Sequence, residues 1–111
     1  MEDRITIFAY MTHTHMLGAE VTGYKVHDGE SSTFARGDPQ EPQTFHELSD
    51  FETIEKGDTL GATCTFDGTR TDRVTRAGHR TEDVMCKLLL MYYQRNDTTS
   101  QIRPCIDNKW Y

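Results

Sequence analysis

Turn-forming pairs divide this chain of 111 residues into short segments rich in β-branched and aromatic residues. The pairs are Asp28-Gly29, Gly57-Asp58 and Asp67-Gly68. An Asp-Gly pair between two such segments favours a tight β-hairpin, because both residues tolerate a positive φ. Many short strands separated by turns every 8–12 residues or so are typical of antiparallel sandwiches. We therefore expect an all-β fold, a single antiparallel β-sandwich of jelly-roll type.

Alternation of apolar and polar residues predicts where the strands lie. In the first strand, Ile5, Ile7 and Ala9 are expected on one side, and Thr6, Phe8 and Tyr10 on the other. The most hydrophobic run covers residues 83–93; its leucines favour a helix and its paired tyrosines favour a strand, and we interpret it as a buried strand. The other expected strands cover residues 4–14, 20–27, 44–48, 51–54, 59–66 and 70–75, with loops at 37–42 and 78–81.

Length and composition indicate one folded domain over residues 1–111. Hydrophobic residues make up 35% of the chain, which suits a soluble domain with a small core. No apolar run approaches the roughly 20 residues that a membrane span requires, and the charged start Met1-Glu2-Asp3-Arg4 does not resemble a signal peptide. The net charge of −6 argues against nucleic acid as a partner.

Three cysteines, Cys64, Cys86 and Cys105, leave several arrangements open. An odd number implies a free thiol, an intermolecular bond or a partner outside this sequence. A bond between Cys64 and Cys86 would stabilise the fold by about 3 kcal/mol in the chain-entropy model. Asn96-Asp97-Thr98 is a glycosylation sequon, a feature of secreted proteins.

Two histidines at positions i and i+2, His13 and His15, are the strongest chemical signal. On a strand they share one face, so two imidazoles converge on one point. Met85 offers a distant thioether, and two imidazoles with one thioether can hold both Cu(I) and Cu(II). Zinc would favour a third histidine, cysteine or carboxylate, and blue copper would need a cysteine thiolate. The alternative is that Met85 packs in the core of a β domain without a metal.

Other residues could surround such a site. Met11 lies on the same face as the histidines and is a candidate wall residue, and His79 could approach from a loop before Met85. His27 and His46 are expected at the surface, away from the site.

The motifs in their order resemble the C-terminal catalytic half of the copper type II, ascorbate-dependent monooxygenases, and most closely the peptidylglycine-hydroxylating branch. The first motif is Thr12-His13-Thr14-His15-Met16-Leu17-Gly18, followed by Thr22-Gly23-Tyr24. The second is Asp83-Val84-Met85-Cys86, leading to Met91-Tyr92-Tyr93. Between them, Gln43-Thr44-Phe45, Gly57-Asp58 and Cys64 fall at matching intervals, so the likeness covers about residues 4–105.

The resemblance implies a jelly-roll domain in which His13, His15 and Met85 hold one copper ion, with a disulfide between Cys64 and Cys86. It also implies dioxygen and ascorbate as co-reactants, a small-molecule or peptide substrate, and a second copper domain upstream. Cys105 matches another cysteine of the family, whose partner lies upstream of the copper histidines. The peptidylglycine branch uses an arginine, an asparagine and a tyrosine to hold its substrate. Those positions are occupied here by Met11, Lys87 and Leu89.

We therefore expect a mononuclear copper redox enzyme that hydroxylates a C–H bond or generates peroxide, in a secreted or lumenal setting that tolerates disulfides. Two alternatives remain: a copper-binding or carrier module without catalysis, and one half of a two-copper monooxygenase of the peptidylglycine type.

Overall fold

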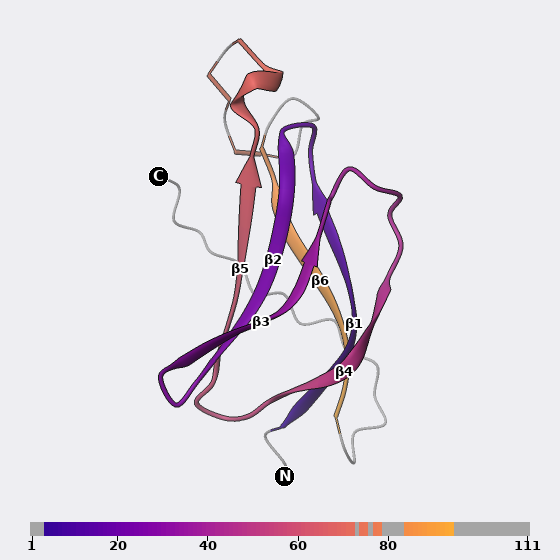
Figure 1. Cartoon of the computed structure of the whole chain (residues 1–111), viewed down its shortest axis with the longest axis vertical. Helices are drawn as coiled ribbons and strands as arrows, with labels where there is room; N and C mark the ends of the chain where they lie inside the picture. The colour runs from indigo at the N-terminus through magenta and orange to yellow at the C-terminus, as the bar shows by residue number, and fades with distance from the viewer. Residues whose placement is uncertain (1–3, 73, 76, 79–83, 95–111) are drawn as a thin grey trace.

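Two three-stranded antiparallel sheets face each other in the computed structural model, which describes residues 4–72, 74, 75, 77, 78 and 84–94 (Figure 1). The strand order is β4-β1-β6 in one sheet and β3-β2-β5 in the other. The predicted antiparallel β-sandwich is therefore confirmed. The elements are β1 (Ile5–Thr14), β2 (Gly18–His27), β3 (Glu30–Gly37), β4 (His46–Ile54), β5 (Thr59–Phe66), the 3-10 turn η1 (Gly68–Arg70) and β6 (Cys86–Tyr93).

The core lies between the two central strands, β1 and β2. Ile7 and Val21 are completely buried there. Because few large side chains are buried, polar contacts between the two sheets help to hold them together. Lys25 on β2 forms an ion pair of 2.6 Å with Glu52 on β4. The same ammonium group donates a hydrogen bond to the carbonyl of Thr53 at 3.1 Å. These contacts join the sheets near the hairpin between β2 and β3.

Turn chemistry explains two of the connections. Asp28 (φ 48°) and Gly29 (φ 79°) both have positive φ and connect β2 to β3, as the Asp-Gly pair predicts. Asp67-Gly68, in contrast, does not form a hairpin. The Asp67 carboxylate accepts a hydrogen bond from the Thr69 backbone N–H and begins η1.

Some predicted strands were wrong in extent. Residues 30–37, a polar stretch, form β3, because pairing with β2 stabilises a strand that composition did not indicate. Residues 44–48 and 51–54 belong to one irregular strand, β4. Residues 70–75 do not form a strand in their described part, and Val74 is 94% exposed. The hydrophobic run forms β6, a strand as predicted, but an edge strand whose residues are half-buried or exposed.

A β-bulge in β1 decides which residues face the core. Ile7 pairs with Tyr92 and Ala9 pairs with Met91, so Phe8 is an extra residue between two consecutive pairs. Before the bulge, Ile7 points inward. After it, Ala9, Thr12 and Thr14 are buried, and a side chain at Gly37 or Gly18 would meet the two threonines. Ile7 and Ala9 are both buried, as the alternation predicts, but beyond Ala9 the buried positions change from odd to even numbers.

Candidate metal centre

The bulge turns His13 and His15 to the outer face of the sheet. An unbroken alternation from the buried Ile7 would have pointed both odd-numbered histidines into the core. Instead, Thr12 and Thr14 face inward and the two imidazoles face outward. Their ring centroids lie 5.6 Å apart, with the ring planes at 85°. Two imidazoles that bind one ion at a metal–nitrogen distance of about 2.0 Å have centroids about 5–6 Å apart. The observed spacing is therefore compatible with one ion bound by both rings.

Met85 directly precedes β6, and the register of β1 and β6 brings its backbone toward the end of β1. Thr14 pairs with Cys86 in the antiparallel ladder, so the next residues outward along the two strands are His15 and Met85. Met85 is half-buried. Its neighbour Val84 forms a bridge with Ala77. The residues on both sides of Met85 are thus held in place.

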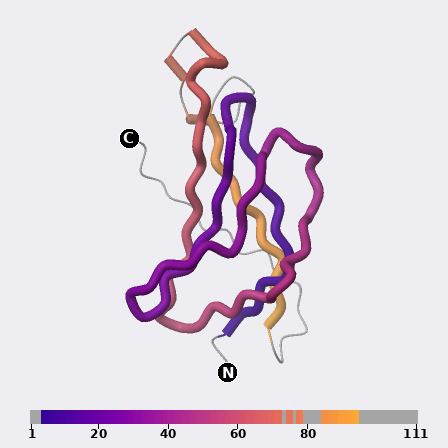
Figure 2. Tube along the Cα trace, viewed as in Figure 1, coloured from indigo at the N-terminus to yellow at the C-terminus, as the bar shows by residue number. Residues whose placement is uncertain are grey.

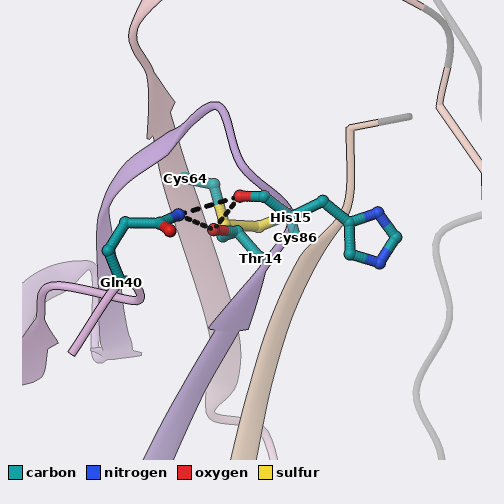
Figure 3. Close-up of a disulfide and its surroundings, with 5 residues drawn as sticks. All are labelled: Thr14, His15, Gln40, Cys64 and Cys86. Atoms are coloured by element: carbon teal, nitrogen blue, oxygen red, sulfur yellow. Dashed lines mark hydrogen bonds between the residues drawn. A yellow bond between two sulfur atoms is a disulfide. The ribbon is translucent and has the colours of Figure 1, made fainter. Parts of the chain in front are cut away.

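The disulfide between Cys64 and Cys86 fixes the start of β6, as the resemblance implied. The two Cα atoms are 5.7 Å apart, and the bond connects edge strand β5 of one sheet to edge strand β6 of the other. In the close-up of this region, the His15 imidazole points away from the disulfide and toward the outside (Figure 3). Cys86 is therefore unavailable as a thiolate ligand, which leaves the thioether of Met85 as the sulfur donor at this end of β6.

A hydrogen bond from the loop between β3 and β4 selects the free nitrogen of His13. The Gln43 amide nitrogen donates to the Pro39 carbonyl at 3.3 Å, so the amide oxygen faces the ring. That oxygen lies 3.2 Å from Nδ1 of His13. Because an amide oxygen only accepts, Nδ1 carries the hydrogen and Nε2 keeps its lone pair for a metal. Gln43 belongs to a segment that supports the family resemblance, but its place in the sequence does not predict this contact.

The expected wall residues lie on neighbouring pairs of the same ladder. His13 pairs with Lys87, and Met11 pairs with Leu89. Lys87 is exposed, and both Met11 and Leu89 are half-buried. His79 and Cys105 lie outside the described residues. Within the described part of the chain, no group of three or more His, Cys, Asp or Glu side chains that could hold a metal is found.

The other two described histidines lie elsewhere, as expected. His46 on β4 packs against Tyr10, with ring centroids 5.5 Å apart. His27 contacts the Asp58 carboxylate at 2.6 Å, between two turns. The hydrogen bond and charge of Asp58 raise the pKa of His27 above 6.5. Hydrogen bonds from the Glu55 backbone and from His27 lower the pKa of Asp58 below 3.8.

Comparisons with known proteins point to one family. Residues 1–109 match the family model for the C-terminal domain of copper type II ascorbate-dependent monooxygenases. The chain is 36% identical over 102 residues to a peptidylglycine alpha-amidating monooxygenase of Rattus norvegicus, covering 92% of this chain and 10% of that protein. It is 28% identical over 113 residues to a dopamine beta-hydroxylase of Canis lupus familiaris, covering 96% of this chain and 18% of that protein. The chain thus spans about a tenth to a fifth of the length of these relatives.

Proposed function

Because the chain belongs to the copper type II ascorbate-dependent monooxygenase family, as a C-terminal domain, we propose that His13, His15 and Met85 hold one copper ion. One observation carries this proposal above the others. The two imidazoles face outward at a spacing that suits a shared metal, and Met85 occupies the next position of the adjoining strand. Two nitrogen donors and one soft sulfur donor form a set that copper accepts in both of its common oxidation states.

When bound, copper supplies one-electron redox chemistry between ascorbate and dioxygen. In a monooxygenation, two electrons from the reductant and two protons reduce one oxygen atom to water, while the other oxygen atom enters a C–H bond of the substrate. The protein's part is to present Nε2 of His13, because the Gln43 hydrogen bond favours the tautomer with its hydrogen on Nδ1. The Met85 thioether favours the reduced ion, because soft sulfur ligands prefer Cu(I).

We place the substrate on the outer face of β1 and β6, beside the histidines. Met11 and Leu89 form an apolar pair there, and Lys87 stands opposite His13 as a cation. Apolar groups would exclude water from the substrate, and the ammonium group of Lys87 would attract an anionic group. A small molecule or peptide that combines an acidic group with an apolar part suits this surface.

The setting we propose is secreted or lumenal, because disulfides persist in oxidising compartments. The Cys64–Cys86 bond supports this location. The described part of the chain contains no helix with the length and hydrophobicity needed to cross a bilayer. A second copper domain in the same protein, as the resemblance implied, would supply a further electron.

Oxygen uptake distinguishes the enzyme from a copper carrier. The protein is loaded with copper, freed of excess metal and mixed with ascorbate, and dioxygen consumption is followed. We expect uptake that is lost in His13→Ala and kept in His46→Ala, a matched change of an exposed histidine on the adjacent strand. Tight Cu(I) binding without uptake would favour the carrier, and equal uptake by both variants would contradict the proposed site.

A further inference from the structure

The carbonyl of His15 receives an unusual number of hydrogen bonds. Its oxygen accepts from the Gly18 backbone N–H at 3.1 Å, from the Thr14 hydroxyl at 2.9 Å and from the Gln40 side-chain amide at 2.9 Å. A carbonyl oxygen has two lone pairs, and the three donors together occupy both of them. Figure 3 shows Gln40 and Thr14 converging on this carbonyl while the His15 ring points the other way.

Gln40 matches this position because an amide nitrogen has two hydrogens. Its nearer acceptors are the carbonyls of His15 at 2.9 Å and Gly18 at 3.0 Å, while the Thr14 hydroxyl lies at 3.4 Å. Gln40 is itself held, because its backbone N–H donates to the Asp38 carboxylate at 2.8 Å. The residue reaches the end of β1 from the connection between β3 and β4, which passes beside it (Figure 2).

We propose that Gln40 is a positioning residue for the copper ligand His15, acting through the backbone carbonyl. This inference rests on the proposed function of His15. Fixing the peptide after His15 limits rotation about its Cα, and so aims the imidazole toward His13 and the end of β6. A ligand held in this way loses less conformational entropy when the metal binds.

Arg70 offers a natural comparison, because it donates hydrogen bonds to other carbonyls of the same turn. Its guanidinium group donates to the carbonyls of Met16 at 3.1 Å and Gly18 at 3.2 Å. If Gln40 served only to stabilise the turn, then removing either side chain should have the same effect on copper. If Gln40 positions His15, only its removal should change the metal site.

The experiment compares Gln40→Met with Arg70→Met, since both replacements keep an unbranched side chain and remove the donors. Urea unfolding gives the stability of each variant, and Cu(II) titration with EPR gives affinity and hyperfine splitting. We expect Gln40→Met to bind Cu(II) about tenfold more weakly, near the lower end of the loss in affinity seen when a group that orients a metal ligand is removed. The hyperfine splitting should also change. Arg70→Met should keep the wild-type spectrum, and Gln40→Lys, which restores a donor, should recover part of the affinity.

Each outcome has a defined meaning. Wild-type protein that binds no copper at His15 would overturn the proposed function itself. Wild-type binding with an unchanged spectrum and affinity in Gln40→Met would overturn only the role of Gln40. Equal spectral changes in Gln40→Met and Arg70→Met would also overturn it. If Gln40→Met does not fold, Gln40→Asn replaces it in the same comparison, because its amide is one methylene too short to reach both carbonyls.

Discussion

At the scale of single residues, the candidate metal centre depends on which atoms are free to donate electrons. Because Nδ1 of His13 is hydrogen-bonded, Nε2 is the nitrogen whose lone pair is free to bind a metal. The disulfide removes Cys86 from the possible ligands, and the sulfur donor that we propose is Met85. A thioether cannot be deprotonated, and it stabilises Cu(I) more than Cu(II). Met85 should therefore have a large effect on the affinity for Cu(I) and a small effect on the stability of the fold.

Replacing Met85 with isoleucine tests this role. The half-buried side chain keeps a similar apolar bulk, so the fold should persist with a small change in the free energy of unfolding. Losing a group that supports a metal ligand typically weakens metal binding about 10–100-fold. Because Met85→Ile removes a ligand itself, Cu(I) affinity should fall by at least this much. Competition with a Cu(I) chelator measures the affinity. Met91→Ile, on the same strand, should leave it unchanged, and equal Cu(I) affinity in both variants would contradict the role of Met85.

The contact between His27 and Asp58 gives stability that depends on pH. Because folding raises the pKa of His27 above 6.5, its contribution is complete below 6.5 and is lost as pH rises through the folded value. Because folding lowers the pKa of Asp58 below 3.8, its contribution is complete above 3.8 and is lost as pH falls through the folded value. The contact is therefore strongest between these two ordinary values.

We expect His27→Ala to reduce the melting temperature most between the two ordinary values, 3.8 and 6.5, and least at alkaline pH above the raised pKa of His27. Thermal unfolding of both proteins across this range provides the test. Asp28→Asn serves as the control, since Asp28 is an exposed and more distant partner of His27 at 3.3 Å, and its effect should be smaller. A difference between wild type and His27→Ala that does not vary with pH would contradict the proposed coupling.

At the scale of elements, two features of β1 and β6 bring the candidate ligands together. The bulge at Phe8 changes which face of β1 the histidines occupy. The disulfide links the start of β6 to β5, and Met85 is the residue directly before the bonded Cys86. The loop closed by this bond spans 22 residues, which corresponds to about 3 kcal/mol in the chain-entropy model.

Replacing Cys64 and Cys86 together with serine should lower the free energy of unfolding by about 3 kcal/mol. The same change should weaken copper binding, because Met85 loses the constraint that keeps it beside His15. Urea unfolding and copper titration measure the two effects. The matched comparison is wild-type protein under non-reducing and reducing conditions, and reduced protein that retained full copper affinity would contradict the positioning role of the bond.

The elements that were predictable from sequence are those with strong local signals. The Asp28-Gly29 hairpin and β5 followed from turn chemistry and alternation. The bulge at Phe8 was not predictable, because a bulge is a property of two paired strands and not of one. The strand β3 was missed because its residues are polar and gain their stability from β2. His13 and His15 could be placed together by spacing alone, but not on the outer face, and the contacts of Gln40 and Gln43 depend on where a long loop folds.

At the scale of the whole molecule, a small core is supplemented by specific ties between two three-stranded sheets. The disulfide joins β5 to β6, and the Lys25–Glu52 ion pair joins β2 to β4. The proposed copper site lies at the end of β1, where the chain turns from one sheet to the other (Figure 1). His13 and His15 are half-buried there, and we propose that a reductant and a substrate reach the site from the outer face of β1.

Copper titration followed by EPR and X-ray absorption is the most direct test of the proposed site. We predict one copper ion per chain, two imidazole nitrogen ligands, and a sulfur scatterer when the ion is reduced. The sulfur signal should disappear in Met85→Ile. Copper that binds without sulfur in the reduced state, or that remains bound after His13 and His15 are both replaced by alanine, would contradict the proposed site.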